Sequence, residues 1–236
     1  MNKYNLDILA FGAHPDDVEI GMAGTIAKYA KKGYKIGICD LTLAELSSNG
    51  TVEIRSKEAK RASEILGVSE RINLHFPDRG LYQIEPYIKK ITTIIRKYKP
   101  KLVFSPYYDD RHPDHGNCSM LVEEAVFSAA IRNYLDEESL TAHRIKSLYF
   151  YMINGFHKPS FVVDVSETMN VKLESLRTYV SQFEKNNLAA DTPLVNGYIE
   201  TVESRERLFG KEVGVQYAEG FMSKKTLLLS SDLLGD

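Results

Sequence analysis

Residues 6–17 of the chain read LDILAFGAHPDD. The apolar run at 6–12 predicts a buried β-strand, and residues 13–17 lead into a helical pattern that extends from about residue 19 to residue 32 and ends at Gly33. A second apolar strand follows at 35–41. This order of strand, helix and strand predicts a βαβ unit, with the AHPDD segment just beyond the carboxyl end of the first strand.

A related segment, RHPDH at 111–115, follows the apolar run KLVFS at 101–105 in the same way. The other strands are expected at 71–76, 147–152 and 161–165, and the other helices at 52–66, 84–98, 117–134, 167–183 and 200–208. Such alternation predicts one α/β domain over residues 1–236. Its sheet would be Rossmann-like, doubly wound and mostly parallel, with helices on both faces.

The two motifs follow the first and the fourth predicted strand. In the common strand order of doubly wound sheets these strands are neighbours where the order reverses, and ligands bind beyond their carboxyl ends. We therefore expect His14 and Asp17 to meet His112 and His115 at one edge of the sheet.

Composition argues against several classes of partner. The 236 residues carry 30 basic and 32 acidic side chains, a formal net charge of −2, so no overall field would recruit nucleic acid or an anionic membrane. The N-terminal residues have the pattern of neither a signal peptide nor a spanning helix, and the two cysteines do not form a disulfide framework. We expect a cytoplasmic protein that acts on a small molecule.

Two imidazoles and one carboxylate are sufficient ligands for a divalent metal ion that keeps an open position for water. His14, Asp17 and His115 provide such a set, which leaves Asp16 and His112 for acid–base chemistry. Taken alone, each motif is as compatible with a helix cap and a loop histidine as with metal ligands. Together, at adjoining strand ends, the two motifs favour one metal site.

The paired motifs resemble the signature of the LmbE/PIG-L superfamily of zinc-dependent N-deacetylases, which act on N-acetylglucosamine conjugates. The segments SSNGTVEIR (47–55) and PDR (77–79), with the chain length, resemble most closely the bacillithiol-pathway deacetylases of N-acetylglucosaminyl-L-malate. The resemblance is weakest after about residue 135. It implies a hydrolase with one zinc ion per chain, or another divalent ion such as Fe²⁺, an anionic glucosaminide as substrate, and a homo-oligomeric, hexameric assembly.

The resemblance also implies roles for individual residues. The zinc ligands would be His14, Asp17 and His115. Asp16 would be the general base that takes a proton from water, and His112 would stabilise the tetrahedral intermediate. The residues implied around them are Asp114, which would orient His112, and Arg55, Arg111 and Tyr198, which would contact the substrate.

Other assignments stay open at the level of sequence. Two histidines and a carboxylate also form the facial triad of non-haem Fe(II) oxygenases, although these usually have β-rich scaffolds. An amidase of S-conjugates in the same superfamily would use the same zinc residues on another amide. A non-enzymatic dinucleotide- or sugar-binding module is disfavoured, because no GxGxxG follows the first strand. The polar, proline-containing stretch at 185–196 is a candidate mobile lid.

Overall fold

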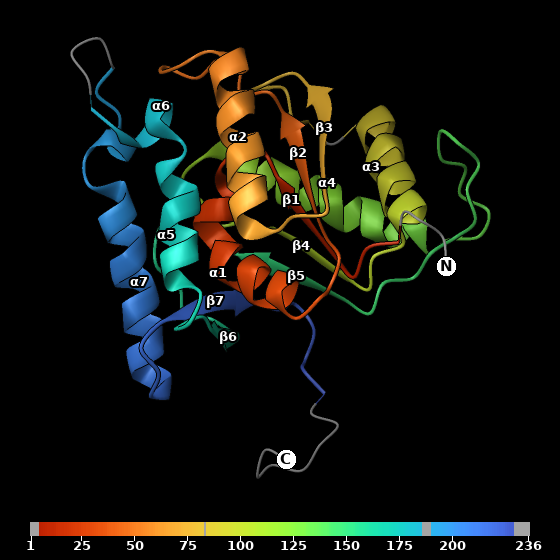
Figure 1. Cartoon of the computed structure of the whole chain (residues 1–236). Coiled ribbons are helices and arrows are strands. Elements are labelled where there is room, and N and C mark those ends of the chain that lie inside the picture. Colours follow the sequence, from red (N-terminus) through yellow and green to blue (C-terminus); the bar gives the residue numbers. More distant parts are fainter. Residues whose placement is uncertain (1–4, 83, 186–189, 229–236) are drawn as a thin grey trace.

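The computed structural model describes residues 5–82, 84–185 and 190–228 and contains a seven-stranded sheet of order β3-β2-β1-β4-β5-β7-β6 (Figure 1). The strands are β1 (Ile8–Gly12), β2 (Ile36–Thr42), β3 (Glu70–Phe76), β4 (Leu102–Pro106), β5 (Ser147–Tyr151), β6 (Phe161–Asp164) and β7 (Ala218–Met222). The five strands from β3 to β5 are parallel, whereas β7 is antiparallel to β5 and β6. The predicted α/β class with a mostly parallel sheet is confirmed.

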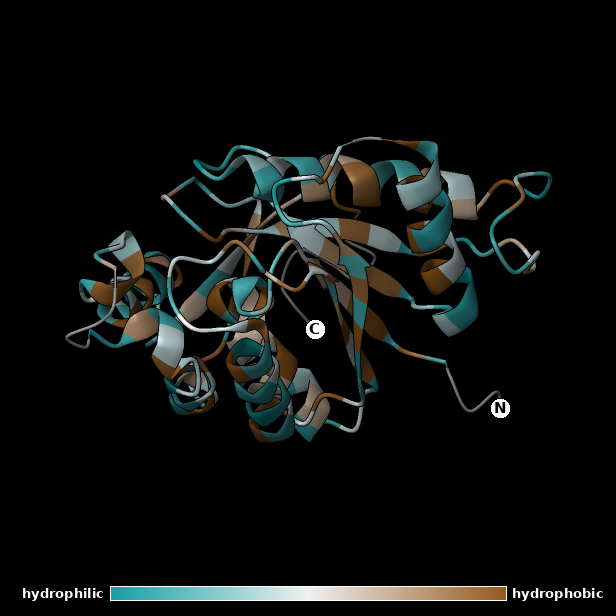
Figure 2. Ribbon diagram, turned by 90° about the horizontal axis from the view of Figure 1, so that it is seen from above, coloured by the Kyte–Doolittle hydropathy of each residue, from teal (hydrophilic) through white to brown (hydrophobic). Residues whose placement is uncertain are grey.

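Helices cover both faces of this sheet, and Figure 2 shows the apolar strands between the two helical layers. The helices are α1 (Asp17–Lys31), α2 (Val52–Leu66), α3 (Glu85–Tyr98), α4 (Pro113–Ala129), α5 (Met169–Arg177), α6 (Val180–Phe183) and α7 (Tyr198–Val213), with a 3₁₀ turn η1 (Pro193–Val195). One face carries α1, α2, α5 and α7, and the other carries α3 and α4 (Figure 1). In the described ranges, no helix is both long and apolar enough to cross a membrane.

The strand β1 lies in the middle of the fold and is buried along its whole length. Its side chains alternate between the two faces: Ile8 and Ala10 belong to the core beneath α1 and α2, and Leu9 and Phe11 belong to the core beneath α3 and α4. Burial on both faces explains why the sequence of this strand is an unbroken apolar run.

The first and fourth strands are neighbours, as the sequence predicts. In the parallel register of β1 and β4, Ile8 lies opposite Leu102 and Ala10 lies opposite Phe104. Adjacent strands are about 4.8 Å apart, so the loops that leave their carboxyl ends begin close together. The fold therefore brings the two histidine motifs to one edge of the sheet without any further contact being required.

Two elements of the C-terminal half differ from the sequence prediction. The strand β7 reads AEGFM, and Glu219 and Gly220 interrupt the apolar pattern that marks a strand. The helix predicted at 167–183 is divided into α5 and α6, because the backbone leaves the helical conformation at Tyr179 (φ −84°, ψ 56°). The hydroxyl of Tyr179 donates a hydrogen bond to Glu19 (2.8 Å), so this break places a buried side chain against α1.

Two helices also differ at both of their ends, and α4 ends at Ala129 rather than at residue 134. Helix α4 begins at Pro113, inside the second motif, rather than at residue 117, because His112 caps it and proline is favoured at the first helical position. Helix α7 extends from Tyr198 to Val213, beyond both ends of the predicted 200–208. Both motifs thus lead directly into helices.

A buried cluster of charges joins α1, α5, α7 and β7. The ammonium of Lys172 lies 2.7 Å from a carboxylate oxygen of Glu206 and 2.7 Å from one of Glu219, and all three side chains are buried. Helix α1 is kinked at Met22 (φ −151°, ψ 21°), and two backbone N–H groups beyond the kink donate to Glu219. The carboxylate of β7 therefore caps the second half of α1.

We expect Lys172→Met to lower the free energy of unfolding by about 3–5 kcal/mol, because it removes the cation shared by two buried carboxylates. Denaturant unfolding measures the change. The matched control is Lys185→Met, since the Lys185 ammonium is exposed and 3.7 Å from Asp191. The control should cost about 0.5 kcal/mol or less. Equal stability of the two variants would contradict this account of the cluster.

Candidate active site

The first motif forms a tight turn between β1 and α1. A Cβ atom on Gly12 would lie 3.1 Å from the carbonyl oxygen of His14 and 3.2 Å from Cβ of Asp17, so glycine permits the close approach. The N–H of His14 donates to Asp17 (2.8 Å), and Asp16 between them has the left-handed backbone conformation (φ 110°). A residue other than glycine is strained at such a φ, and strain of this kind is concentrated at functional sites.

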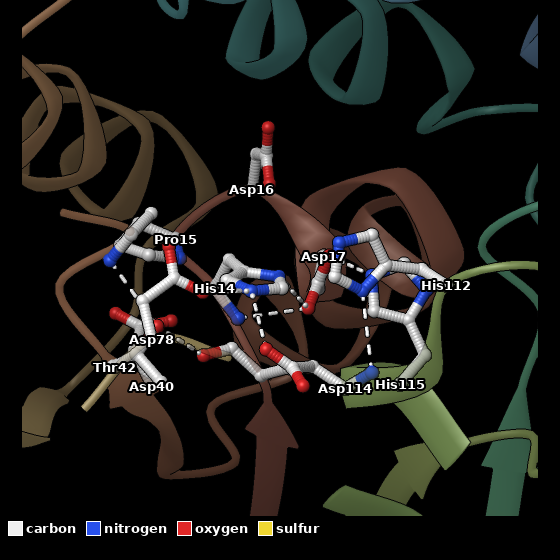
Figure 3. Close-up of polar contacts among 12 residues, drawn as sticks. His14, Pro15, Asp16, Asp17, Asp40, Thr42, Asp78, His112, Asp114 and His115 are labelled. Carbon is white, nitrogen blue, oxygen red and sulfur yellow. Dashed lines mark hydrogen bonds and ion pairs between the residues drawn. The ribbon is translucent and has the colours of Figure 1, made fainter. Parts of the chain in front are cut away.

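The two aspartates of this motif point in opposite directions (Figure 3). Asp17 lies between two imidazoles, with Oδ2 3.5 Å from Nδ1 of His14 and Oδ1 3.2 Å from Nε2 of His115. Asp16 points away from the histidines. Asp17 thus lies among the predicted metal ligands, whereas the Asp16 carboxylate is free of them and available as a base.

The second motif supplies two histidines to the same cluster. Ring nitrogens of His14, His112 and His115 lie within 4.8 Å of one another, close enough to share a metal ion. The rings of His112 and His115 are stacked, with centroids 4.7 Å apart. Asp17 is not part of this group of three, and it joins the cluster through its two oxygens facing His14 and His115.

Two carboxylates that sequence reasoning did not assign to the site lie behind these histidines. Nε2 of His14 is 3.1 Å from Asp78, and Nδ1 of His115 is 2.9 Å from Asp110. Burial acts to raise the pKa of Asp78 and of Asp110, but the contact with a histidine brings each pKa down to about 2. A carboxylate beside one ring nitrogen orients the ring and directs the other nitrogen, here the one that faces Asp17, towards a metal ion.

The donor set fits a divalent metal ion. Two imidazole nitrogens and one carboxylate are the ligands of many catalytic zinc sites. Burial acts to raise the pKa of Asp17, but the neighbouring His115 and His14 hold it well below its usual range, so the carboxylate is ionised. A buried anion between two imidazoles is a suitable place for a cation.

Asp114 occupies a different position from the one that the resemblance implies. Its buried carboxylate accepts hydrogen bonds from the backbone N–H of Arg79 (2.9 Å) and from the Arg79 guanidinium (3.0 Å), and it lies 3.6 Å from Nε2 of His14. The hydrogen bond between Asp114 and His112 runs from the Asp114 backbone N–H to Nδ1 of the ring (3.3 Å). Asp114 therefore orients His112 through its main chain, and its carboxylate supports His14.

His112 is half-buried at the start of α4. Burial lowers the pKa of His112, and the nearby His115 and His14 lower it further. Because Nδ1 accepts the hydrogen bond from Asp114, the proton of the neutral ring resides on Nε2. The neutral ring can therefore donate a hydrogen bond from Nε2.

Arg55, predicted to contact substrate, is bound to Asp16. Its guanidinium donates to Oδ2 of Asp16 (2.7 Å), to the carbonyl oxygen of Pro15 (2.9 Å) and, more weakly, to the hydroxyl of Ser47 (3.4 Å). Both charged side chains are buried. Burial raises the pKa of Asp16 to about 7 although Arg55 acts to lower it. The arginine that follows loop 46–51 therefore fixes the position of the candidate base.

The cluster opens into a cavity of about 270 Å³ whose lining includes Arg55, Arg111 and Tyr198. The hydroxyl of Tyr198 lies 3.0 Å from the carbonyl oxygen of Ile153 and 3.1 Å from Oδ1 of Asn154, so its proton is directed to the loop after β5. Arg111 is exposed at the cavity. All nine predicted site residues lie in or beside this cavity, with Asp114 directly behind it.

Comparison with known proteins identifies the family. The family model described as "PIG-L: GlcNAc-PI de-N-acetylase" matches residues 9–126. A diacetylchitobiose deacetylase of Thermococcus kodakarensis is 34% identical over 226 residues, which cover 90% of this chain and 81% of the relative. This chain belongs to the PIG-L family. The family resemblance predicted from the two histidine motifs is confirmed.

Two further relatives cover nearly the whole chain. A probable N-acetyl-alpha-D-glucosaminyl L-malate deacetylase 2 of Bacillus anthracis is 27% identical, with 87% of this chain and 94% of the relative covered. The crystal structure of a conserved protein from Thermus thermophilus, TT1542, is 37% identical with a TM-score of 0.87, and covers 95% of this chain and 97% of that one.

The PIG-L match ends at residue 126 and therefore contains both histidine motifs, the Arg55–Asp16 pair, Asp78 and Asp110. Much of the cavity lining lies outside the match, namely Ile153, Asn154, Gln182, Thr192, Pro193, Leu194 and Tyr198. The part of the cavity that contains the histidine cluster is thus the part shared with the PIG-L family.

Proposed function

We propose that this chain hydrolyses the acetamido group of an N-acetylglucosamine conjugate, with water as the nucleophile and a divalent metal ion, zinc before others, as cofactor. The observation that carries the proposal is the different placement of two neighbouring carboxylates. Asp17 lies between two imidazoles, whereas Asp16 points away from them and lines the same cavity. A ligand set and a separate base in one cavity are what metal-assisted amide hydrolysis requires.

The ligands in this proposal are His14, Asp17 and His115, with one ion per chain. When bound, the ion would polarise the acetamido carbonyl and lower the pKa of a water molecule from about 15.7 towards about 7. Asp78 and Asp110 would hold the two imidazoles in the required tautomer. The match to a family of de-N-acetylases supports this chemistry over an oxygenase or a non-enzymatic binding module.

Asp16 is the general base. A pKa of about 7 is well matched to accepting a proton at neutral pH, and the 2.7 Å contact with Arg55 fixes the carboxylate in position. The carboxylate takes a proton from water as the water oxygen attacks the acetamido carbon. When the C–N bond breaks, the same proton passes to the sugar nitrogen, which leaves a free amine and acetic acid, and the acid loses its remaining proton to solvent to give acetate.

His112 stabilises the negative charge that develops on the carbonyl oxygen. Its Nδ1 is occupied by the Asp114 backbone N–H, so the ring can donate from Nε2. A neutral donor already held in place costs no reorganisation when the charge appears. We expect His112→Ala to lower turnover and to leave the metal content unchanged.

For the aglycone, the group linked to the anomeric carbon of the glucosamine, we propose L-malate first. The supporting observations are the resemblance of residues 47–55 and the Bacillus anthracis relative named for that substrate. With Arg55 bound to Asp16, Arg111 is the predicted arginine left to meet a carboxylate. A neutral conjugate such as N,N′-diacetylchitobiose is the second candidate. It is favoured by the Thermococcus relative and by the uncharged side chains of the cavity, Ser47, Ser48, Asn49, Gln182 and Thr192.

The assay that tests the proposed reaction measures amine release by the metal-reconstituted protein from a panel of N-acetylglucosaminides. The panel contains N-acetylglucosamine, N,N′-diacetylchitobiose and N-acetylglucosaminyl-L-malate. We expect release from at least one member at a rate that depends on added metal. A panel without amine release, using protein shown to bind metal, would contradict the proposal.

Arg111→Ala distinguishes the two aglycones. If Arg111 binds a malate carboxylate, its loss should lower kcat/KM for the malate conjugate about ten- to hundredfold and should affect the neutral conjugate much less. The matched control is Arg132→Ala, which removes an exposed guanidinium beyond the end of α4. Equal losses on the two conjugates would show that Arg111 does not recognise the aglycone.

The remaining partner assignments are also proposals. A small-molecule substrate, without nucleic acid or membrane, agrees with the net charge of −2. The homo-oligomer, a hexamer by resemblance, predicts a particle of several chains of 26.7 kDa, which light scattering after size exclusion would measure. The proposed lid at 185–196 includes residues 186–189, which lie outside the described part of the chain.

A further inference from the structure

One asparagine side chain joins two distant segments at the cavity. Asn49 lies in loop 46–51, which connects β2 to α2, and its amide is buried. Its Nδ2 donates to the carbonyl oxygen of Ala190 (3.1 Å), and its Oδ1 accepts from the N–H of the same residue (2.7 Å). The side chain therefore satisfies both backbone groups of one residue that is 141 positions away in sequence.

Ala190 begins the segment 190–195, which we call the wall segment. Three of its residues, Thr192, Pro193 and Leu194, line the cavity together with Leu46 to Asn49 of the loop. The wall segment has little regular structure of its own, since it contains only the 3₁₀ turn η1 within the described residues. Its position against the cavity therefore depends on contacts with neighbouring elements. Asn49, on the loop between β2 and α2, supplies two hydrogen bonds to the first residue of the wall segment, Ala190.

The loop that carries Asn49 is itself held firmly against α6. Nε2 of Gln182 donates to the carbonyl oxygen of Asn49 (2.8 Å), and the hydroxyl of Ser47 donates to the same oxygen (3.1 Å). Gly50 has a positive φ of 78°, and a Cβ there would lie 2.8 Å from Cβ of Ser181. These contacts use the backbone around Asn49, so they persist when its side chain is replaced.

We infer that Asn49 positions the wall segment and thereby shapes the aglycone subsite, which makes it a specificity-determining residue acting through residues 192–194. The inference rests on the proposed function. The reacting acetamido group lies at the histidine cluster, so the rest of a conjugate must extend along the remaining lining, which includes the wall. N-acetylglucosamine alone has little to place there. Wall position should therefore affect extended substrates more than the single sugar.

The test compares Asn49→Ala with the wild-type enzyme on N-acetylglucosamine and on the conjugate that the wild-type enzyme deacetylates fastest. We expect kcat/KM for the conjugate to fall about tenfold, mainly because KM rises. A tenfold change corresponds to the loss of one or two hydrogen bonds. The fall for N-acetylglucosamine should be smaller. Asn49→Asp keeps the acceptor for the Ala190 N–H and loses the donor, so it should give an intermediate value.

A second readout does not depend on activity. Amide hydrogen exchange in residues 190–195 should be faster in Asn49→Ala, because the Ala190 N–H loses its acceptor and the wall segment is less firmly held. Asn133→Ala, an exposed asparagine after α4, is the matched control and should resemble the wild type in both assays. Equal losses on the single sugar and the conjugate, or unchanged hydrogen exchange in residues 190–195, would overturn the inference. Absence of deacetylation by the wild-type enzyme would instead contradict the proposed function, while the exchange measurement would still report on Asn49.

Discussion

Replacing His115 with alanine is expected to remove both the metal ion and the activity. Nε2 of His115 is 3.2 Å from Asp17, and Nδ1 is 2.9 Å from Asp110. The ring therefore lies between another proposed ligand and the carboxylate that supports the ring itself. Without the ring, Asp17 and Asp110 remain as buried acids, and two protein ligands are too few for a catalytic zinc site. Metal content per chain, measured after dialysis against a defined zinc concentration, and amine release should fall together to background.

The matched control is His143→Ala. The Nε2 atom of His143 contacts the carbonyl oxygen of Pro100 (2.7 Å), at the amino end of β4 and therefore at the opposite edge of the sheet. This variant should keep one metal ion per chain and wild-type turnover. If His115→Ala retained full metal occupancy and activity, the proposed ligand set would be wrong.

Replacing Asp16 with asparagine is expected to lower turnover about 10²- to 10⁴-fold while the metal remains bound, since this is the usual contribution of a general base. The carboxylate accepts a hydrogen bond from Arg55 (2.7 Å). It points away from the histidines (Figure 3), so its loss leaves the ligand cluster intact. Asparagine also tolerates a positive φ better than most residues, so the backbone at φ 110° should be preserved.

Asp17→Asn is the contrasting variant on the neighbouring residue. It replaces an ionised carboxylate that lies between His14 and His115, and it should therefore weaken metal binding as well as turnover. Parallel measurement of zinc content and kcat separates the two roles. Loss of zinc in Asp16→Asn with retention in Asp17→Asn would mean that the roles of the two aspartates are exchanged.

The sequence predicted the fold well where burial is continuous. The apolar runs of β1 and β4 and the glycine or proline stops beside them indicated the parallel strands and the meeting of the two motifs. It failed at β7, because Glu219 is buried there only by virtue of Lys172 and two N–H groups of the kinked α1. No local pattern reports a pairing that is made across such sequence distances.

The sequence predicted which residues form the candidate site better than it predicted which partners those residues contact. Spacing and the family resemblance selected the residues of the cavity, but they could not show that Arg55 turns inward to Asp16 or that the Asp114 carboxylate faces His14. Both outcomes depend on side-chain direction across different loops. Residue identity alone does not determine such directions.

Three residues were missed as functional candidates. Asp78 lies in the PDR turn that carried part of the resemblance, and Asp110 directly precedes the second motif, so proximity to the motifs was a usable signal for both. Asn49 offered a weaker one. It belongs to the SSNGT segment, but its partner Ala190 could be found only from the fold.

The measurement that tests the central claim most directly is the stoichiometry of acetate and amine released from the best substrate of the panel by metal-free and by zinc-loaded protein. We predict equal amounts of acetate and amine from the zinc-loaded protein, background release from the metal-free protein, and recovery when zinc is restored. Two results would contradict metal-dependent deacetylation at this site. One is full release of acetate and amine by protein shown to contain no metal, and the other is consumption of the substrate by the zinc-loaded protein without release of acetate.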